Sequence, residues 1–121
     1  MSEPILRRFT KPNAGTVNVQ ELMTDDITSL TFLQLNSGNV IVDMFMDPAP
    51  AASQRYTIEL FKNSISTGRN FFSTAMDTSS AGRSAVGPIR LAAGQMQLGS
   101  TQTAGTAAAN CSVVVKFAGG F

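Results

Sequence analysis

The chain has no histidine, no tryptophan, one cysteine and few charged residues. Without histidine, the commonest general base and metal ligand is missing, which excludes histidine-based triads and histidine-containing zinc sites. The single thiol, Cys111, cannot form a disulfide within the chain. No run approaches the ~18 apolar residues of a membrane helix. We therefore expect a protein made in a reducing compartment that is not an enzyme, carries no cofactor or metal and does not bind a membrane.

Charge is scarce. Charged residues make up 14% of the 121 residues, against roughly 25% in an average soluble domain. The remaining polar surface is uncharged, a composition typical of β-sandwiches in assemblies, where neighbouring copies cover part of each molecule. The net charge of +1 gives no reason to expect nucleic acid as a partner.

The lone cysteine is interpreted as a core residue. Cys111 alternates with Val113, Val115 and Phe117, as a small buried hydrophobe on a strand would. A reactive thiol needs a cationic or helix-N-terminal setting, and nothing in the sequence suggests one.

Two further groups of residues are candidate sites. Asp25-Asp26, and Asp43 with Asp47, supply oxygen ligands for calcium but lack the ligand density of a dedicated loop, so solvated turn acids are the preferred reading. A glycosidase-type acid pair stays open, because only the separation of two carboxylates in space decides it. The pair Phe71-Phe72 beside Arg69 is the nearest approach to a nucleic-acid surface, and core aromatics beside a surface arginine explain it more simply.

The clearest strand is residues 55–63. Tyr56, Ile58 and Leu60 fall on one side of a period-two pattern, and the following Asn63-Ser64 supplies turn chemistry, with a second turn at Thr67-Gly68. Further strands are predicted at residues 16–22, 28–35, 40–46, 70–74, 86–91, 95–98 and 110–118, the last with Ser112, Val114 and Lys116 pointing outward.

Turn signals recur every 8 to 15 residues and no long helical period is present, which favours an all-β fold. The predicted architecture is a jelly-roll-like antiparallel β-sandwich of about eight strands over residues 14–121, preceded by an extended N-terminal arm at residues 1–13.

The arm has two readings. It holds three basic residues and two prolines and shows no strand period, so it is either a frayed terminus or a docking segment. In the docking reading, apolar anchors and cations meet the acidic groups of a partner. The predicted partner-binding residues are Ile5, Leu6, Arg7, Arg8, Phe9 and Lys11.

A family resemblance rests on residues 56–63, followed by residues 86–91, Ala93-Gly94-Gln95 and residues 102–105. Over roughly residues 54–121, this order of strands and turns resembles the small cement or decoration proteins of tailed bacteriophages. C1q- and tumour-necrosis-factor-like trimers share the order, but no collagen-like stalk or secretory signal is found here. The resemblance implies a β-sandwich, commonly a homotrimer, on the outside of an icosahedral head, with an N-terminal arm that reaches across capsid subunits.

The expected function is therefore structural: a cement protein, made in the host cytoplasm, that binds the major capsid protein on the virion exterior and bridges adjacent subunits. Two alternatives remain. One is a small coat protein that forms the shell by itself. The other is a trimeric receptor- or carbohydrate-binding module, which exposed aromatic residues would favour.

Overall fold

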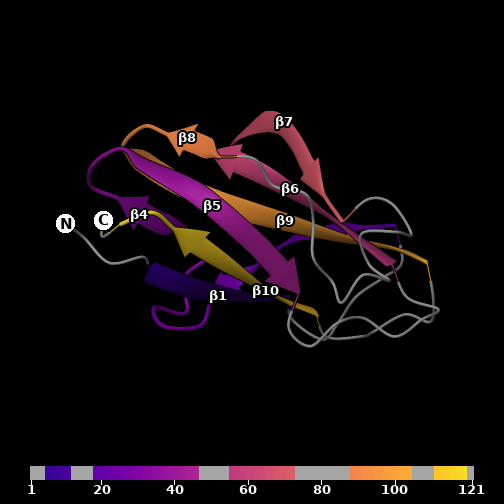
Figure 1. Cartoon of the computed structure of the whole chain (residues 1–121). Helices are drawn as coiled ribbons and strands as arrows, with labels where there is room; N and C mark the ends of the chain where they lie inside the picture. Colours follow the sequence, from indigo (N-terminus) through magenta and orange to yellow (C-terminus); the bar gives the residue numbers. More distant parts are fainter. Residues whose placement is uncertain (1–4, 12–17, 47–54, 73–87, 105–110, 120–121) are drawn as a thin grey trace.

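The computed structural model describes residues 5–11, 18–46, 55–72, 88–104 and 111–119, and every regular element within these ranges is a β-strand (Figure 1). The strands are β1 (Ile5–Lys11), β2 (Gln20–Leu22), β3 (Thr24–Asp25), β4 (Leu33–Leu35), β5 (Asn39–Met46), β6 (Arg55–Lys62), β7 (Ile65–Phe71), β8 (Ile89–Leu91), β9 (Gly94–Ala104) and β10 (Cys111–Phe117).

The strands form two sheets. The first has the order β3-β1-β10-β5-β8 and the second the order β2-β9-β6-β7, with β4 also paired to β9. Because β6 occupies one edge of β9, β2 and β4 share the other and act as one interrupted strand. Apart from the two-residue β3, eight strand positions remain within the described ranges, in agreement with the predicted number.

The pairing is nested. β1 pairs with β10, β2 and β4 with β9, β5 with β8, and β6 with β7, and all of these pairs are antiparallel. The chain thus behaves as one long hairpin that folds over on itself. The pairs β10–β5 and β6–β9 join the folded hairpin into two sheets. This arrangement is a jelly roll, and it confirms the predicted all-β sandwich.

The core lies between the two sheets because each strand turns one face inward. On β6, Tyr56, Ile58 and Leu60 are buried and the residues between them are half-buried, as the period predicted. The hydrophobic side chains of this core that are exposed by 1% or less are Phe9, Met23, Leu35, Ile41, Met44, Tyr56, Ile58, Leu60, Phe72, Met96, Leu98, Val113, Val115 and Phe117.

β10 follows the predicted alternation with one difference. Cys111, Val113, Val115 and Phe117 are buried as expected, but Val114, predicted to point outward, is also only 6% exposed. It lies on the outer face in register between Arg8 of β1 and Phe45 of β5. Cross-strand neighbours share a face, so two large side chains flank it there.

The β6–β7 hairpin turns at the predicted position. Asn63 and Ser64 both have positive φ, 53° and 65°, which is the backbone of a two-residue type I′ turn. The Asn63 N–H donates to the Gln95 carbonyl (2.7 Å), and the Gln95 N–H donates back to Asn63 Oδ1 (2.9 Å). Gly94 completes this contact, because a Cβ there would lie 2.6 Å from Asn63 Oδ1.

Several predicted boundaries are corrected. Residues 28–32 lie in turns and bends before β4, because backbone and side-chain bonds fold them back on Asp25. β7 begins at Ile65, and the predicted turn at Thr67-Gly68 is a bulge inside that strand. β9 runs well past the predicted residues 95–98. Residues 16, 17, 73, 74, 86, 87 and 110 of the predicted strands lie outside the described residues.

The N-terminal arm is also corrected. Ile5–Lys11 form β1, which lies between β3 and β10 inside the first sheet. The period was missed because two of the four inward positions carry cations, Arg7 and Lys11, where a strand pattern calls for apolar residues. Residues 1–4, 12 and 13 of the predicted arm lie outside the described residues.

Candidate interaction surface

The six residues predicted to bind a partner separate into buried and surface positions. Phe9 and Lys11 are fully buried between the sheets, so a partner cannot reach them while the sandwich is folded. Leu6 is 56% exposed and lies on the outer face. Ile5 and Arg8 are half-buried.

The sixth residue, Arg7, points inward and forms an ion pair with Asp25 of β3. Its positive charge is therefore already matched within the chain. Partner binding by the N-terminal residues stays a prediction, now limited to the side chains of β1 that reach the surface.

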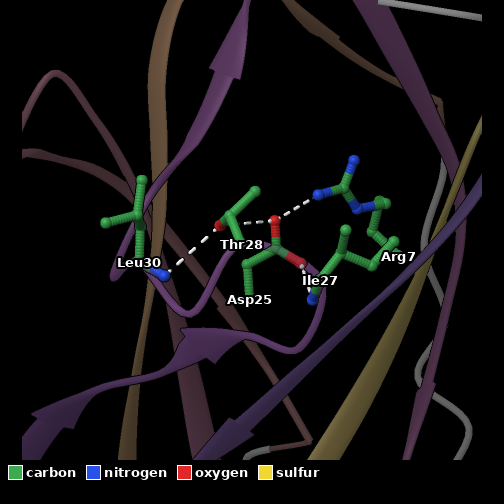
Figure 2. A network of polar contacts seen from close by, with 5 residues as sticks. All are labelled: Arg7, Asp25, Ile27, Thr28 and Leu30. Carbon is green, nitrogen blue, oxygen red and sulfur yellow. Dashed lines mark hydrogen bonds and ion pairs between the residues drawn. The ribbon is translucent and has the colours of Figure 1, made fainter.

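Asp25 is the centre of a network of polar contacts (Figure 2). Its carboxylate is fully buried and accepts hydrogen bonds from the Arg7 guanidinium, the Ile27 N–H (3.1 Å) and the Thr28 hydroxyl (3.2 Å). Multiple charge-assisted hydrogen bonds compensate a buried carboxylate. The sequence reading of Asp25 as a solvated turn acid is therefore wrong.

The same network orders the loop after β3. The Ser29 N–H donates to the Asp25 carbonyl and the Asp25 N–H donates to the Leu30 carbonyl, both at 2.8 Å. Thr28 Oγ1 accepts the Leu30 N–H (3.3 Å). Ser29 has a positive φ of 63°, a backbone conformation that this closed turn imposes.

The ordered loop presents apolar side chains to solvent. Ile27 is 73% exposed and Leu30 is also exposed, although the loop that carries them begins at the buried Asp25. An apolar side chain on a loop held by hydrogen bonds loses little conformational entropy when it docks. The sequence signal was Asp25 itself, because an Asp side chain accepts the backbone N–H two residues on in an Asx turn, here that of Ile27. Nothing local marked the carboxylate as buried.

A second polar cluster lies in the interior. Lys11 faces Cys111 across the β1–β10 pair, and its Nζ lies 5.9 Å from the ring centroid of Tyr56, which comes from the second sheet. Neither Lys11 Nζ nor Tyr56 Oη has a hydrogen-bond partner among the described residues, and both atoms are buried. The cluster therefore holds a cation with no described acid beside it.

The Cys111 thiol and the Tyr56 hydroxyl, which belong to this cluster, both have raised pKa values. Burial raises the pKa of the Cys111 thiol to about 11, although a contact with the Ser100 hydroxyl and the charge of Lys11 act in the opposite direction. Burial, with a contribution from Cys111, raises the pKa of Tyr56 to about 12. Cys111 is a protonated, buried thiol at neutral pH, which agrees with its predicted role in the core.

The outer face of the second sheet is polar and has few charges. Glu59 accepts hydrogen bonds there from Gln20 of β2 (2.8 Å) and from the Ser66 hydroxyl of β7, and these bonds, Ser66 first, lower its pKa. Glu59 thus joins three strands through side chains alone. Both oxygens of its carboxylate accept hydrogen bonds from side chains of the same chain.

Three further features of the described residues bear on possible sites: metal ligands, the aromatic pair and a surface hollow. Within the ranges covered by the structure, no group of three His, Cys, Asp or Glu side chains could hold a metal ion. Phe71 and Phe72 are buried, which confirms the core reading of that pair. A hollow of about 290 Å³ beside residues 38–40, Arg90 and Leu91 is open to solvent. Asp47 lies outside the described residues.

Comparisons with known proteins add no identification: no protein family, no curated protein and no solved structure matches the chain. Among the described residues, no helix has the length and hydropathy needed to cross a membrane. The class that the described strands define is a jelly-roll β-sandwich.

Proposed function

We propose that this protein is a structural component of a virus particle, a cement protein that binds the outside of an icosahedral capsid and bridges adjacent subunits. The observation that carries the proposal is the nested strand pairing, because jelly rolls recur in viral capsid proteins, lectins and cupins. Cupins and lectins, the other two classes, need particular residue types at their binding sites, and the sequence can be searched for them.

The cupin and lectin alternatives receive less support. Histidine, the commonest ligand of catalytic metals, is absent from the sequence. Sugar stacking uses exposed aromatic rings, whereas the aromatic side chains in the described ranges are buried or half-buried. A role in assembly requires neither metal ligands nor aromatic platforms.

The proposed contact with the capsid uses the ordered loop after β3. Ile27 and Leu30 are apolar, exposed and presented by a loop that the Asp25 network holds in place. With β1 inside the first sheet, this loop replaces the predicted arm as the leading docking element. Leu6, on the outer face of β1, is a second exposed anchor.

Co-sedimentation with capsids tests this proposal. The chain would be expressed with the major capsid protein encoded in the same genome, and we expect it to sediment with the assembled heads. The double variant Ile27→Ser/Leu30→Ser should fold normally and remain in the soluble fraction. Ile65→Ser, at an equally exposed position on β7, is the matched control and should still bind. No binding by the unchanged chain contradicts the function, and full binding by the double variant contradicts the docking element.

A self-assembling coat protein is the second candidate. It is favoured by the finding that Ile5–Lys11 belong to the sheet, since this leaves a single jelly roll rather than a domain with a separate clamp over those residues. The purified chain alone would then form closed particles, which electron microscopy would show. The cement proposal instead expects a small oligomer, with a trimer as the expected state, measured by light scattering.

A further inference from the structure

β7 is the outermost strand of the second sheet as far as the structure describes it. It pairs with β6 on one side only, and its residues from Ile65 to Asn70 are exposed, Ile65 by 71%. An open edge strand normally offers free N–H and C=O groups to a strand of another chain. This edge is therefore one place where a second copy could extend the sheet, the other being the edge formed by β2 and β4.

The pairing of β7 is interrupted at its centre. Phe61 faces Ser66 and Glu59 faces Asn70, so one residue of β6 lies opposite three residues of β7. The middle one, Gly68, has a φ of 80°, which favours glycine. Figure 1 shows β7 curving at this edge of the sheet. Bulges of this kind bend an edge and interrupt its row of backbone groups.

Two consecutive hydroxyls hold the bulge. The Thr67 hydroxyl donates to the Leu60 carbonyl (2.7 Å) and accepts the Arg69 N–H (3.3 Å). The Ser66 hydroxyl donates to the Glu59 carboxylate and accepts the Gly68 N–H (3.1 Å). Each hydroxyl thus binds β6 on one side and an amide of its own strand, two residues on, on the other.

We infer that Ser66 and Thr67 close this edge against strand addition, so that neither a second copy nor another extended chain continues the second sheet beyond β7. The amides of Gly68 and Arg69 already donate to side chains of β7 and are therefore not free to bond an incoming strand. A single hydroxyl bonded to the amide two residues on is common turn chemistry. Here two such bonds fall together on the extra residues of an exposed edge.

The consequence for assembly concerns the β7 edge. Association there must use side chains of the outer face or the loops, because two neighbouring backbone amides of the exposed strand already have partners. This inference does not depend on the proposed capsid function, since it concerns the purified chain alone.

Amide hydrogen exchange measured by NMR tests the first step. Ser66→Ala should speed exchange of the Gly68 amide, and Thr67→Val that of the Arg69 amide, each by about fivefold for the loss of one hydrogen bond. Thr57→Val removes a hydroxyl from the neighbouring strand β6 and is the matched control, with no change expected at either amide. Wild-type exchange rates at both amides in the single variants would overturn the inference.

Sedimentation at increasing concentration tests the second step. The variant Ser66→Ala/Thr67→Val should self-associate at concentrations where the wild type and Thr57→Val keep their oligomeric state, and association should slow exchange again along β7. A double variant that keeps the wild-type state at every concentration would refute the closure. So would an associated form whose newly protected amides lie away from β7.

Discussion

Two cations on the inward face of β1 make a natural comparison. Arg7 meets the buried carboxylate of Asp25, whereas Lys11, four residues further along the same face, has no hydrogen-bond partner among the described residues. Removing one partner of a buried ion pair lowers the free energy of unfolding strongly, because the other charge stays buried without compensation. A buried cation that has no partner carries the same cost of desolvation in the native protein. On β1, Arg7 thus stabilises the loop after β3 through Asp25, whereas the buried charge of Lys11 lowers the stability of the fold.

The largest effect is expected from breaking the pair. Asp25→Asn leaves the Arg7 guanidinium without its carboxylate, and we expect unfolding free energy to fall by about 3–5 kcal/mol. Urea denaturation measures it, and faster exchange of the Ile27 amide should accompany it. Asp26→Asn, at the exposed neighbouring acid, is the control. Equal losses in the two variants would show that the buried pair has no special role.

The opposite sign is expected at Lys11. Lys11→Met replaces a fully buried ammonium by an apolar side chain of similar length, and stability should rise by about 1–4 kcal/mol. The contact of Nζ with the Tyr56 ring opposes this gain, since a desolvated cation–π contact is worth about 2 kcal/mol. Thermal unfolding of the variant beside Leu6→Met, on the outer face of the same strand, gives the comparison. A destabilised Lys11→Met protein would mean that the ammonium is paired after all.

The dependence of stability on alkaline pH tests the surroundings of Lys11 through the neighbouring thiol of Cys111. Its pKa is raised by burial from an ordinary value of 9.0 to about 11, so the folded state binds the proton more tightly and stability is lost as pH rises from 9 to 11. The loss attributable to this thiol is about 1–3 kcal/mol. Urea titrations at pH 8 and 10.5 measure it.

Two variants isolate this loss. Cys111→Ala should remove the part due to the thiol and leave a later one from Tyr56, whose pKa is about 12. Lys11→Met should enlarge the loss, because Lys11 favours the thiolate. An alkaline profile that is the same in all three proteins would contradict the raised thiol pKa.

The smallest effect is expected at Glu59, whose partners are exposed hydrogen bonds. Because its pKa is lowered, Glu59 contributes stability above the unfolded value of about 4.5, and this is lost as pH falls through the folded pKa. Glu59→Gln should therefore flatten the stability profile between pH 7 and 3. Glu21→Gln, on β2, is a matched control. An unchanged profile in Glu59→Gln would show that Ser66 and Gln20 do not favour the charged form.

The sequence predicted the strands in which apolar residues alternate without interruption. β6 and β10 lie where the pattern of Tyr56, Ile58 and Leu60 and that of Val113 and Val115 placed them, and the Asn63-Ser64 turn follows from its chemistry. In these segments local propensity and burial agree, so the sequence alone is sufficient.

Prediction from the sequence failed where the structure of a segment depends on a residue that is distant in the sequence. Arg7 is acceptable on an inward face only because Asp25, 18 residues further on, reaches it. Thr67-Gly68 was read as a turn because glycine marks turns and bulges alike. Only pairing with β6 separates the two. The exposed Ile27 was missed for the same reason, since the loop that presents it is ordered by a buried carboxylate.

The nested pairing has a consequence for biosynthesis. β1 is made early, yet its neighbour in the sheet is β10, and the hydroxyls of Thr10 and Ser112 that meet across the pair (3.0 Å) are 102 residues apart in the chain. Folds dominated by such distant pairings form slowly. The Arg7 and Lys11 side chains of β1 therefore reach their inward positions between the sheets only after β10 has been made.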